Sequence, residues 1–413
     1  MQAIYDYIHS IKSFSANARL FLLASFAGAL YHSVFSVLGN LYILRAGLTE
    51  TFLGTMISAA SFASVLFALP AGLLSDRIGR RKALVLAAVI AAAMQLTIIL
   101  FPSAVVILVA TFLGGAASAV MMVSGSPFLV ENSTREERAH LFSISSASYT
   151  ISGIGGSFLG GTLPLWWARA LSAAPASLVV YRATLLTAFF ILVLAVIPYF
   201  HIKETSVVRT SASPRFSLRL ARPRLIGCFV IPELFMGLGA GLVIPFLNVY
   251  FSNHLGANAT QIGMIFSVMS LITTIGVLGA PLLGRKYGKV GATVLTRLLS
   301  VPLLIVIAMA SNLWFAASAA WLRSALMNMS NPLVGSFTME VLEPSERATV
   351  SSILGMTWNL GWGISARLAG HIMKTYSYSL PYYFTAVLYT LSALTFYYFF
   401  ASREQELTAT VAD

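Results

Sequence analysis

Long apolar stretches alternate with short polar segments along the whole chain. Each stretch has about 20 residues, the length that a helix needs to cross a bilayer. Strands of a membrane barrel would instead alternate apolar and polar positions over about 10 residues, so these uniform runs indicate helices. The predicted spans are 18–44, 50–74, 83–101, 104–130, 141–165, 180–200, 224–251, 260–284, 290–310, 313–338, 350–372 and 379–401.

The longest polar stretch, 201–223, contains Ser, Thr, Arg and two prolines and is typical of a linker. It divides the chain into halves of six spans, residues 1–200 and 224–413. Several positions repeat between the halves at an offset of 209 residues, which indicates duplicated, parallel halves related by an axis along the membrane normal. The run Gly72–Arg80 matches Pro281–Lys289, Glu131 and Arg138 match Glu340 and Arg347, and Asn40-Leu41-Tyr42 resembles Asn248-Val249-Tyr250 at an offset of 208.

Composition supports a membrane protein, because 58% of the residues are apolar and only 10% are charged, against about 25% charged in soluble domains. A soluble enzyme, a nucleic-acid-binding protein and a secreted scaffold are excluded. The net charge of +12 is mostly a topology signal, since nineteen of the 26 Lys and Arg residues fall on the side of the N-terminus. The positive-inside rule therefore predicts that both termini are cytoplasmic.

No cofactor or metal site is expected. Cys228 is the single cysteine, and the six histidines show no paired metal-ligand spacing. The sequence has no phosphate-binding loop of the G-x-x-x-x-G-K-[ST] type, so ATP is not expected to drive the protein directly.

The loop Gly72-Leu-Leu-Ser-Asp76-Arg77-Ile-Gly79-Arg80-Arg81-Lys82 resembles the signature between helices two and three of the major facilitator superfamily. The resemblance extends over all twelve spans, the central linker and a degenerate second copy of the loop. It implies an all-α integral membrane fold of twelve transmembrane helices in two six-helix bundles. A central cavity, lined by helices one, four, seven and ten, would open alternately to each side.

The resemblance gives this loop a gating role, in which the acid at Asp76 caps a neighbouring helix and joins charge pairs of the outward-open state. The second copy has Arg285 at that position, which predicts a weaker or differently paired latch. A repeated E-x6-R pattern supplies further pairs, although anchoring and solvated loops are alternative readings. The predicted gating residues are Gly72, Asp76, Arg77, Gly79, Arg80, Arg81, Glu131, Arg138, Glu340 and Arg347.

The glycine-rich stretch Ser152–Gly161 resembles the helix-five signature of the drug:proton antiporter branch. Two departures count against that branch: Ser157 replaces the usual proline, and Thr111 stands where those antiporters have a helix-four arginine. The alternative reading is plain helix packing by small residues.

An ionisable side chain inside a bilayer costs about 2.5–3.5 kcal/mol on insertion scales, so each one is a functional candidate. Glu233, the one acid deep in a span, and His32 are the proton-coupling candidates. Arg323 and Arg367 are expected either to bind an anionic substrate group or, for Arg323, to pair with Glu233. Arg297 lies near a span end and is expected to snorkel.

Polar residues at steps of four mark helix faces that must avoid lipid, and aromatic and methionine side chains tolerate varied amphipathic ligands. Packing or lipid contact is the alternative for most of the aromatic residues and methionines. The substrate-cavity candidates are Arg323, Arg367, Asn331, Asn328, Ser36, Asn40, Tyr149, Trp358, Asn359, Trp362 and Met122.

The sequence therefore predicts a secondary transporter rather than an enzyme. The leading hypothesis is proton-coupled export of a small amphipathic compound by a monomer in the plasma membrane of a prokaryote. Uptake or facilitated passage of an organic anion and translocation of a lipid or lysolipid are alternatives within the same class. A non-transporting receptor or scaffold is the alternative from a different class.

Overall fold

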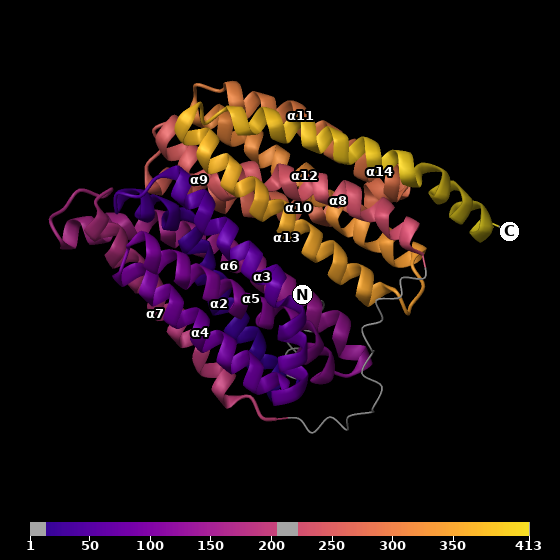
Figure 1. Ribbon diagram of the computed structural model, residues 1–413, viewed down its shortest axis with the longest axis horizontal. Coiled ribbons are helices and arrows are strands. Elements are labelled where there is room, and N and C mark those ends of the chain that lie inside the picture. Colours follow the sequence, from indigo (N-terminus) through magenta and orange to yellow (C-terminus); the bar gives the residue numbers. More distant parts are fainter. Residues whose placement is uncertain (1–13, 205–221, 413) are drawn as a thin grey trace, which may run out of the picture. The chain divides into compact units, whose positions relative to one another are not determined.

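The computed structural model describes residues 14–204 and 222–412 as helices and short connections, with no β-strand in those ranges. The first half contains α2 (Ala16–Arg45), α3 (Glu50–Ile78), α4 (Arg80–Leu100), α5 (Ala104–Glu131), α6 (Arg135–Ala170) and α7 (Leu178–His201) (Figure 1). The second half contains α8 (Pro223–Val243), α10 (Ala259–Tyr287), α11 (Lys289–Met309), α12 (Leu313–Val341), α13 (Arg347–Thr375) and α14 (Leu380–Ala412). Every predicted span overlaps one of these helices, although the span 224–251 continues past the end of α8. Most of the predicted linker 201–223 falls outside the described residues.

Helix α8 continues through an irregular segment. A 3-10 turn, η1 (Ile244–Phe246), a short helix, α9 (Leu247–Val249), and a π turn, η2 (Tyr250–His254), follow it without a break. Pro245 lies in the 3-10 turn and has no N–H for the helical ladder, which is consistent with the change of pitch.

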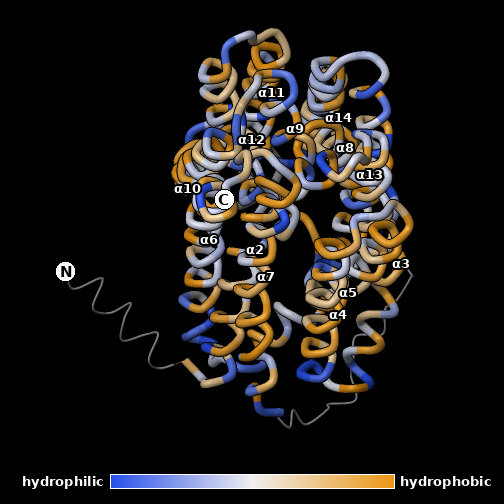
Figure 2. Tube along the Cα trace, turned by 90° about the vertical axis from the view of Figure 1, so that its left-hand side faces the viewer, coloured by the Kyte–Doolittle hydropathy of each residue, from blue (hydrophilic) through white to orange (hydrophobic). Residues whose placement is uncertain are grey.

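Nine of the helical stretches in the described part of the chain are long and apolar enough to cross a membrane. Figure 2 shows the apolar colour along the bodies of the helices and the polar colour gathered toward their ends. The three long helices outside this group are α6, α12 and α13, which carry more polar and small residues. A membrane helix tolerates such residues where it faces protein or water instead of lipid.

The chain divides into two compact units, each with helix segments from both halves. Unit 1 consists of Met1–Leu48, Ala59–Thr210 and Asn258–Ser267, and unit 2 consists of Thr49–Ser58, Ser211–Ala257 and Val268–Asp413. The first turns of α3 thus belong to unit 2, and the first turns of α10 belong to unit 1.

The same packing pattern occurs in both units. In unit 1, α2 packs against α6 and α7, and α4 packs against α5 and α7. In unit 2, α8 packs against α13 and α14, and α11 packs against α12 and α14. The contacts of the second set follow the first helix by helix, as the internal repeat predicts.

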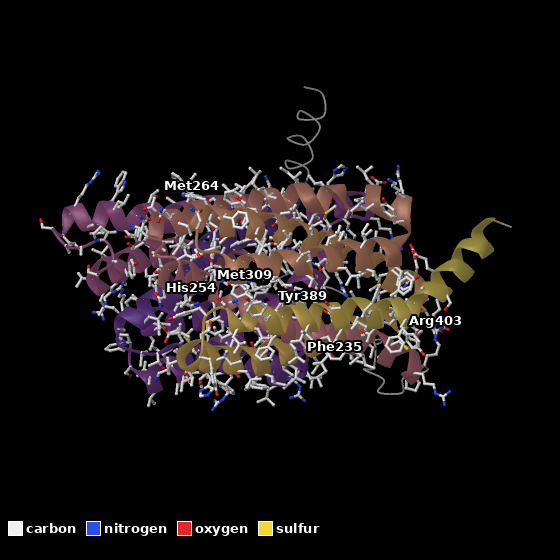
Figure 3. All side chains as sticks on the ribbon, turned by 90° about the horizontal axis from the view of Figure 1, so that it is seen from above. Phe235, His254, Met264, Met309, Tyr389 and Arg403 are labelled. Atoms are coloured by element: carbon white, nitrogen blue, oxygen red, sulfur yellow. The ribbon has the colours of Figure 1, made fainter. Side chains whose placement is uncertain are left out.

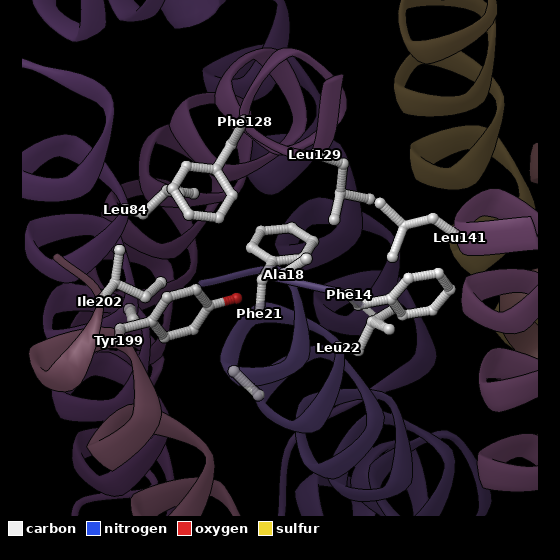
Figure 4. Close-up of a cluster of buried hydrophobic side chains, with 12 residues drawn as sticks. Phe14, Ala18, Phe21, Leu22, Leu84, Phe128, Leu129, Leu141, Tyr199 and Ile202 are labelled. Carbon is white, nitrogen blue, oxygen red and sulfur yellow. The ribbon is translucent and has the colours of Figure 1, made fainter. Parts of the chain in front are cut away.

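A cluster of packed aromatic side chains lies at the equivalent end of each unit. In unit 1, the Phe21 ring lies 5.3 Å from Phe128 and 6.0 Å from Tyr199, inside a buried cluster (Figure 4). In unit 2, the Phe229 ring lies 6.4 Å from Phe337. Phe21 and Phe229 are 208 residues apart, and Phe128 and Phe337 are 209 apart. The duplication therefore extends to the core side chains.

A buried tyrosine forms the same hydrogen bond in both units. Tyr42 donates to the carbonyl oxygen of Ile99 over 2.6 Å, and Tyr250 donates to that of Ile307 over 2.5 Å. Both tyrosines are fully buried, where an unpaired hydroxyl or carbonyl would cost about 1–3 kcal/mol. Each bond fixes the first helix of a half to its third.

Candidate functional site

The predicted gating loops are joined to the E-x6-R motifs by one ion pair in each unit. Arg80 Nε lies 2.6 Å from Glu131 Oε1 in unit 1, and Lys289 Nζ pairs with Glu340 in unit 2. Both pairs obey the 209-residue offset. The end of each unit that carries this pair is called the motif end below.

A second acid lies beside each loop, and the sequence reading missed both. Gly79 (φ +91°) and Gly288 (φ +74°) adopt the left-handed conformation that glycine tolerates. A Cβ on either glycine would lie 2.8 Å from a carboxylate, that of Glu204 or Glu404. The Glu404 carboxylate also accepts a hydrogen bond from the backbone N–H of Val290 over 3.1 Å, at the positive end of α11. The sequence feature that could have indicated these two residues is an acid shortly after the sixth and the twelfth predicted span.

The remaining gating candidates take different positions. Arg81 donates to the carbonyl oxygen of Phe200 over 3.0 Å and so holds the loop to the end of α7. Arg138 donates to Val130 O over 3.3 Å and Arg347 to Leu342 O over 3.2 Å, so each arginine of the E-x6-R motif bonds the backbone. Asp76 and Arg77 are exposed on the last turn of α3.

Gly72 does not need to be glycine for packing, because the nearest atom to an added Cβ is Val123 Cγ1 at 3.7 Å. That is ordinary van der Waals contact. Gly72 therefore marks no close helix contact, whereas Gly79 occupies a turn with positive φ.

The helix-five glycines pack tightly against two neighbours. A Cβ on Gly156 would lie 2.5 Å from Leu30 O on α2. A Cβ on Gly263, in the first turns of α10, would lie 2.5 Å from Ser157 O and 2.6 Å from the Cα of Gly161. Thr260 of the same turns donates to Gly161 O over 2.9 Å. This arrangement supports close packing within unit 1 as a role for the stretch.

The equivalent contact occurs in unit 2 at the offset of 209. A Cβ on Gly54, in the first turns of α3, would lie 2.5 Å from Ala366 O on α13, and one on Gly370 would lie 2.2 Å from Glu50 O. The hydroxyl of Tyr378 donates to Glu50 Oε1 over 2.5 Å. Burial and the neighbouring carboxylate raise the pKa of Tyr378 to about 12, so the phenol keeps its proton at neutral pH.

The predicted polar face of α2 points away from the helices that pack on α2. His32 and Ser36 are exposed, and Asn40 is partly buried. The opposite faces of the helix, at Leu30 and Val34, lie against Gly156 and Gly160 of α6. An exposed polar face, as at His32 and Ser36, must meet water or protein rather than lipid.

Two cavity candidates of the first half are among its most exposed side chains. Met122 on α5 is 66% exposed and Tyr149 on α6 is 64% exposed. Both are thus available for contact with a ligand, although exposure alone fits lipid contact equally well.

Glu233 meets a different arginine from the one expected. The cation that acts on its carboxylate is Arg297 of α11. Arg297 is 3% exposed, donates to Ser392 Oγ over 3.1 Å, and lies 5.4 Å from the centre of the Phe396 ring. The predicted snorkelling of Arg297 is therefore wrong, because α14 supplies both a hydrogen-bond acceptor and an aromatic face inside the unit.

Arg323 lies inside unit 2 as well, on the buried face of α12. It is 5% exposed and forms a side-chain hydrogen bond to Tyr389 of α14, a residue that is labelled in Figure 3. Met327, one turn along, is also buried, whereas Asn331 is exposed. The three residues expected on one polar face are thus divided between the interior of the unit and its surface.

The neighbouring asparagines of α12 hydrogen-bond within their own helix. Asn328 donates to Ser324 O over 2.8 Å, and Asn331 donates to Asn328 Oδ1 over 3.3 Å.

The candidates on α13 lie beside a tight helix contact, and Trp358, Asn359 and Trp362 are partly buried. Arg367 is exposed, and Asn359 donates to the carbonyl of Gly355 over 2.9 Å. The Trp358 and Trp362 rings lie 6.1 Å apart. Gly237 and Gly241 of α8 allow close approach to the backbone of these two tryptophans.

Comparisons with known proteins agree with this architecture. A family model described as Major Facilitator Superfamily matches residues 20–235 and 230–412. An uncharacterised MFS-type transporter of Methanocaldococcus jannaschii is 26% identical over 161 residues, and the match spans 39% of this chain and 41% of that relative.

Two crystal structures share the fold at low sequence identity. A bacterial homolog to the human lysosomal transporter Spinster, inward-facing and unoccupied, has a TM-score of 0.76 and 13% identity over 94% of this chain and 96% of its own. A D-xylose-proton symporter has a TM-score of 0.72 and 16% identity over 95% of this chain and 98% of its own.

Proposed function

Since the chain belongs to the Major Facilitator Superfamily, we propose that it is a secondary transporter that exports a small amphipathic compound in exchange for protons. The predicted fold class, an all-α membrane protein of this superfamily, is confirmed. Transport is the activity that the family supports. Proton coupling, export and the drug:proton antiporter branch belong to the proposal.

The observation that carries proton coupling is the placement of Glu233. Its carboxylate is partly buried inside unit 2, and Arg297 is the cation that acts on it. Protonation of Glu233 would remove the charge that Arg297 faces, and so would change the forces between α8, α11 and α14. A group in this position can couple a proton to movement of helices without touching the substrate.

Each unit is proposed to offer its own contacts to the substrate. Met122 and Tyr149 are exposed in unit 1, and the partly buried Trp358 and Trp362 of unit 2 supply adaptable apolar side chains for an amphipathic compound. His32, Ser36 and Asn40 add hydrogen-bonding groups on α2. His32 is the second proton-carrier candidate, because its ordinary pKa is near neutral.

The motif ends are proposed to lie at the cytoplasm, where nineteen basic residues concentrate. The Arg80–Glu131 and Lys289–Glu340 pairs are proposed to break and re-form during alternating access. Partly exposed pairs of this kind are worth only about 0–1 kcal/mol. We further propose a monomer in a prokaryotic plasma membrane.

A flux assay in proteoliposomes tests the proposal. An imposed proton gradient should drive uptake of a fluorescent amphipathic cation against its own gradient. Glu233→Gln should reduce this flux at least about tenfold, a loss of about 1.4 kcal/mol or more of coupling, and should leave substrate binding intact. Glu346→Gln, outside the spans and paired with Arg222, is the matched control. Full gradient-driven flux in Glu233→Gln would exclude this carboxylate as the carrier.

Passage of an organic anion is the second candidate function, and the exposed position of Arg367 on α13 favours it. A guanidinium suits carboxylate and phosphate groups. In the same liposomes, a dicarboxylate flux that is lost in Arg367→Gln, without dependence on a proton gradient, would support this alternative over the first.

A further inference from the structure

Among the residues that the structure describes, the interior of unit 2 contains one more cation than it has carboxylates to balance. Arg297 and Arg323 are 3% and 5% exposed. Glu233 is the acid that acts on Arg297. Among the described residues, no ion pair joins Arg323 to a carboxylate. Arg323 is therefore a buried cation without a counter-charge.

Two polar atoms near Arg323 lack hydrogen-bond partners. Its own Nη1 is fully buried and unpartnered, and so is the hydroxyl of Tyr382 on α14. Arg323 acts electrostatically on both Tyr382 and Tyr389. Helices α12 and α14 both run toward the motif end, and side chains lean toward the start of their helix. Tyr382 lies in the first turn of α14, two turns before Tyr389 and on the same face of that helix.

Burial of an uncompensated charge costs several kcal/mol, and buried polar atoms are otherwise almost always paired. A water molecule would pair the two orphaned atoms but would leave the charge unbalanced. A monovalent anion satisfies both requirements, because Nη1 and the Tyr382 hydroxyl are both able to donate to it.

We propose that unit 2 holds a small inorganic anion of the halide class between Arg323 of α12 and Tyr382 of α14. The ring of Tyr250 lies 4.6 Å from that of Tyr382, and the side chains of Tyr250, Tyr382 and Tyr389 are all buried. Such a site is lined by aromatic rings and weakly hydrated guanidinium, so it favours a small, easily dehydrated ion over a phosphate or a large organic acid.

This anion is structural and does not depend on the proposed transport activity. It bridges α12 and α14, which the Arg323–Tyr389 hydrogen bond already joins. The first half has no counterpart, because Gly114 occupies the position equivalent to Arg323 at the offset of 209.

The test measures the thermal stability of the purified full-length protein in detergent while bromide or chloride replaces gluconate at constant ionic strength. Unfolding is followed by intrinsic tryptophan fluorescence. The melting temperature should rise with halide and saturate, as expected for a ligand that binds only the folded state. Arg323→Gln should abolish the saturable rise, and Tyr382→Phe should weaken the apparent affinity about fivefold, the effect of losing one hydrogen bond. Arg169→Gln, which removes an exposed arginine from α6 of unit 1, should leave the rise unchanged.

Several results would overturn the proposal. Wild-type protein without a saturable halide effect would mean that water alone fills the site. The same halide effect in Tyr382→Phe as in wild type would place the anion elsewhere, and this variant decides the matter even where Arg323→Gln fails to fold. Because the readout is stability, the result is independent of whether the protein transports protons.

Discussion

The two halves of the chain are alike at the ends of their helices and unlike in their interiors. The ion pairs Arg80–Glu131 and Lys289–Glu340, the tyrosine bonds of Tyr42 and Tyr250, and the glycine contacts of Gly54 and Gly263 all repeat at 208 or 209 residues. The buried charges do not repeat. Ala88 and Gly114 stand where the second half has Arg297 and Arg323.

This difference separates two kinds of function within one duplicated fold. The features at the helix ends are those for which we propose a gating role, and they occur in both halves. The interior charges are those for which we propose coupling or ion binding, and they occur in the second half alone. Under these proposals, the second half is the place where an ion acts.

The largest expected effect on stability comes from removing the buried charges that distinguish the second half from the first. Arg297→Leu should destabilise the protein by about 3 kcal/mol, because Glu233 is left without its cation. The double variant Arg297→Leu with Glu233→Leu should recover most of that loss, since it makes the second half as uncharged here as the first. Thermal and SDS-induced unfolding measure both. A double variant no more stable than the single one would show that Glu233 and Arg297 are not coupled.

The next effect tests the similarity of the ends. Gly54→Val and Gly263→Val each place a Cβ 2.5 Å from a backbone oxygen that cannot move aside. Each should cost about 1–3 kcal/mol by overpacking. Gly28→Val is the matched control, because nothing lies within 4 Å of its Cβ. Thermal unfolding in detergent gives the comparison, and a large loss in one variant with none in the other would mean that the two contacts are not equivalent.

The smallest effect concerns the ion pairs. Glu131→Gln and Glu340→Gln should each change stability by less than about 1 kcal/mol, and high salt should reduce the difference from wild type. The loss should be slightly larger for Glu131, whose side chain is 26% exposed against 52% for Glu340. Melting temperatures at low and high salt measure this. A larger loss for Glu340 would contradict the order expected from exposure.

The helices and the repeat could be predicted because their signals are local or periodic. Runs of apolar residues define each span, and the shared offset predicted that Tyr42 and Tyr250 occupy equivalent positions. Gly79 could also be read locally, since a glycine between two helices suits a left-handed turn.

The interior of unit 2 could not be predicted because its contacts join distant parts of the chain. Arg297 looked like a snorkelling residue from its place on its own helix. Its burial depends on a hydrogen bond to Ser392, which is 95 residues away in the sequence. Nothing in the sequence around Ser392 indicates that it accepts this bond. The bond from Arg323 to Tyr389 is equally non-local, so the sequence left both alternatives for Arg323 open, substrate binding and pairing with Glu233.

The membership of the first turns of α3 in unit 2 has a consequence for the order of biosynthesis. Gly54 leaves the ribosome 312 residues before Ala366, the residue whose carbonyl it packs against. At about 5–20 residues per second, this segment waits about 15 to 60 seconds for its partner. The first turns of α10 meet theirs at once, because residues 154–161 are already made when Gly263 emerges. One of two equivalent contacts is therefore able to form as soon as Gly263 emerges, and the other only after Ala366 has been made.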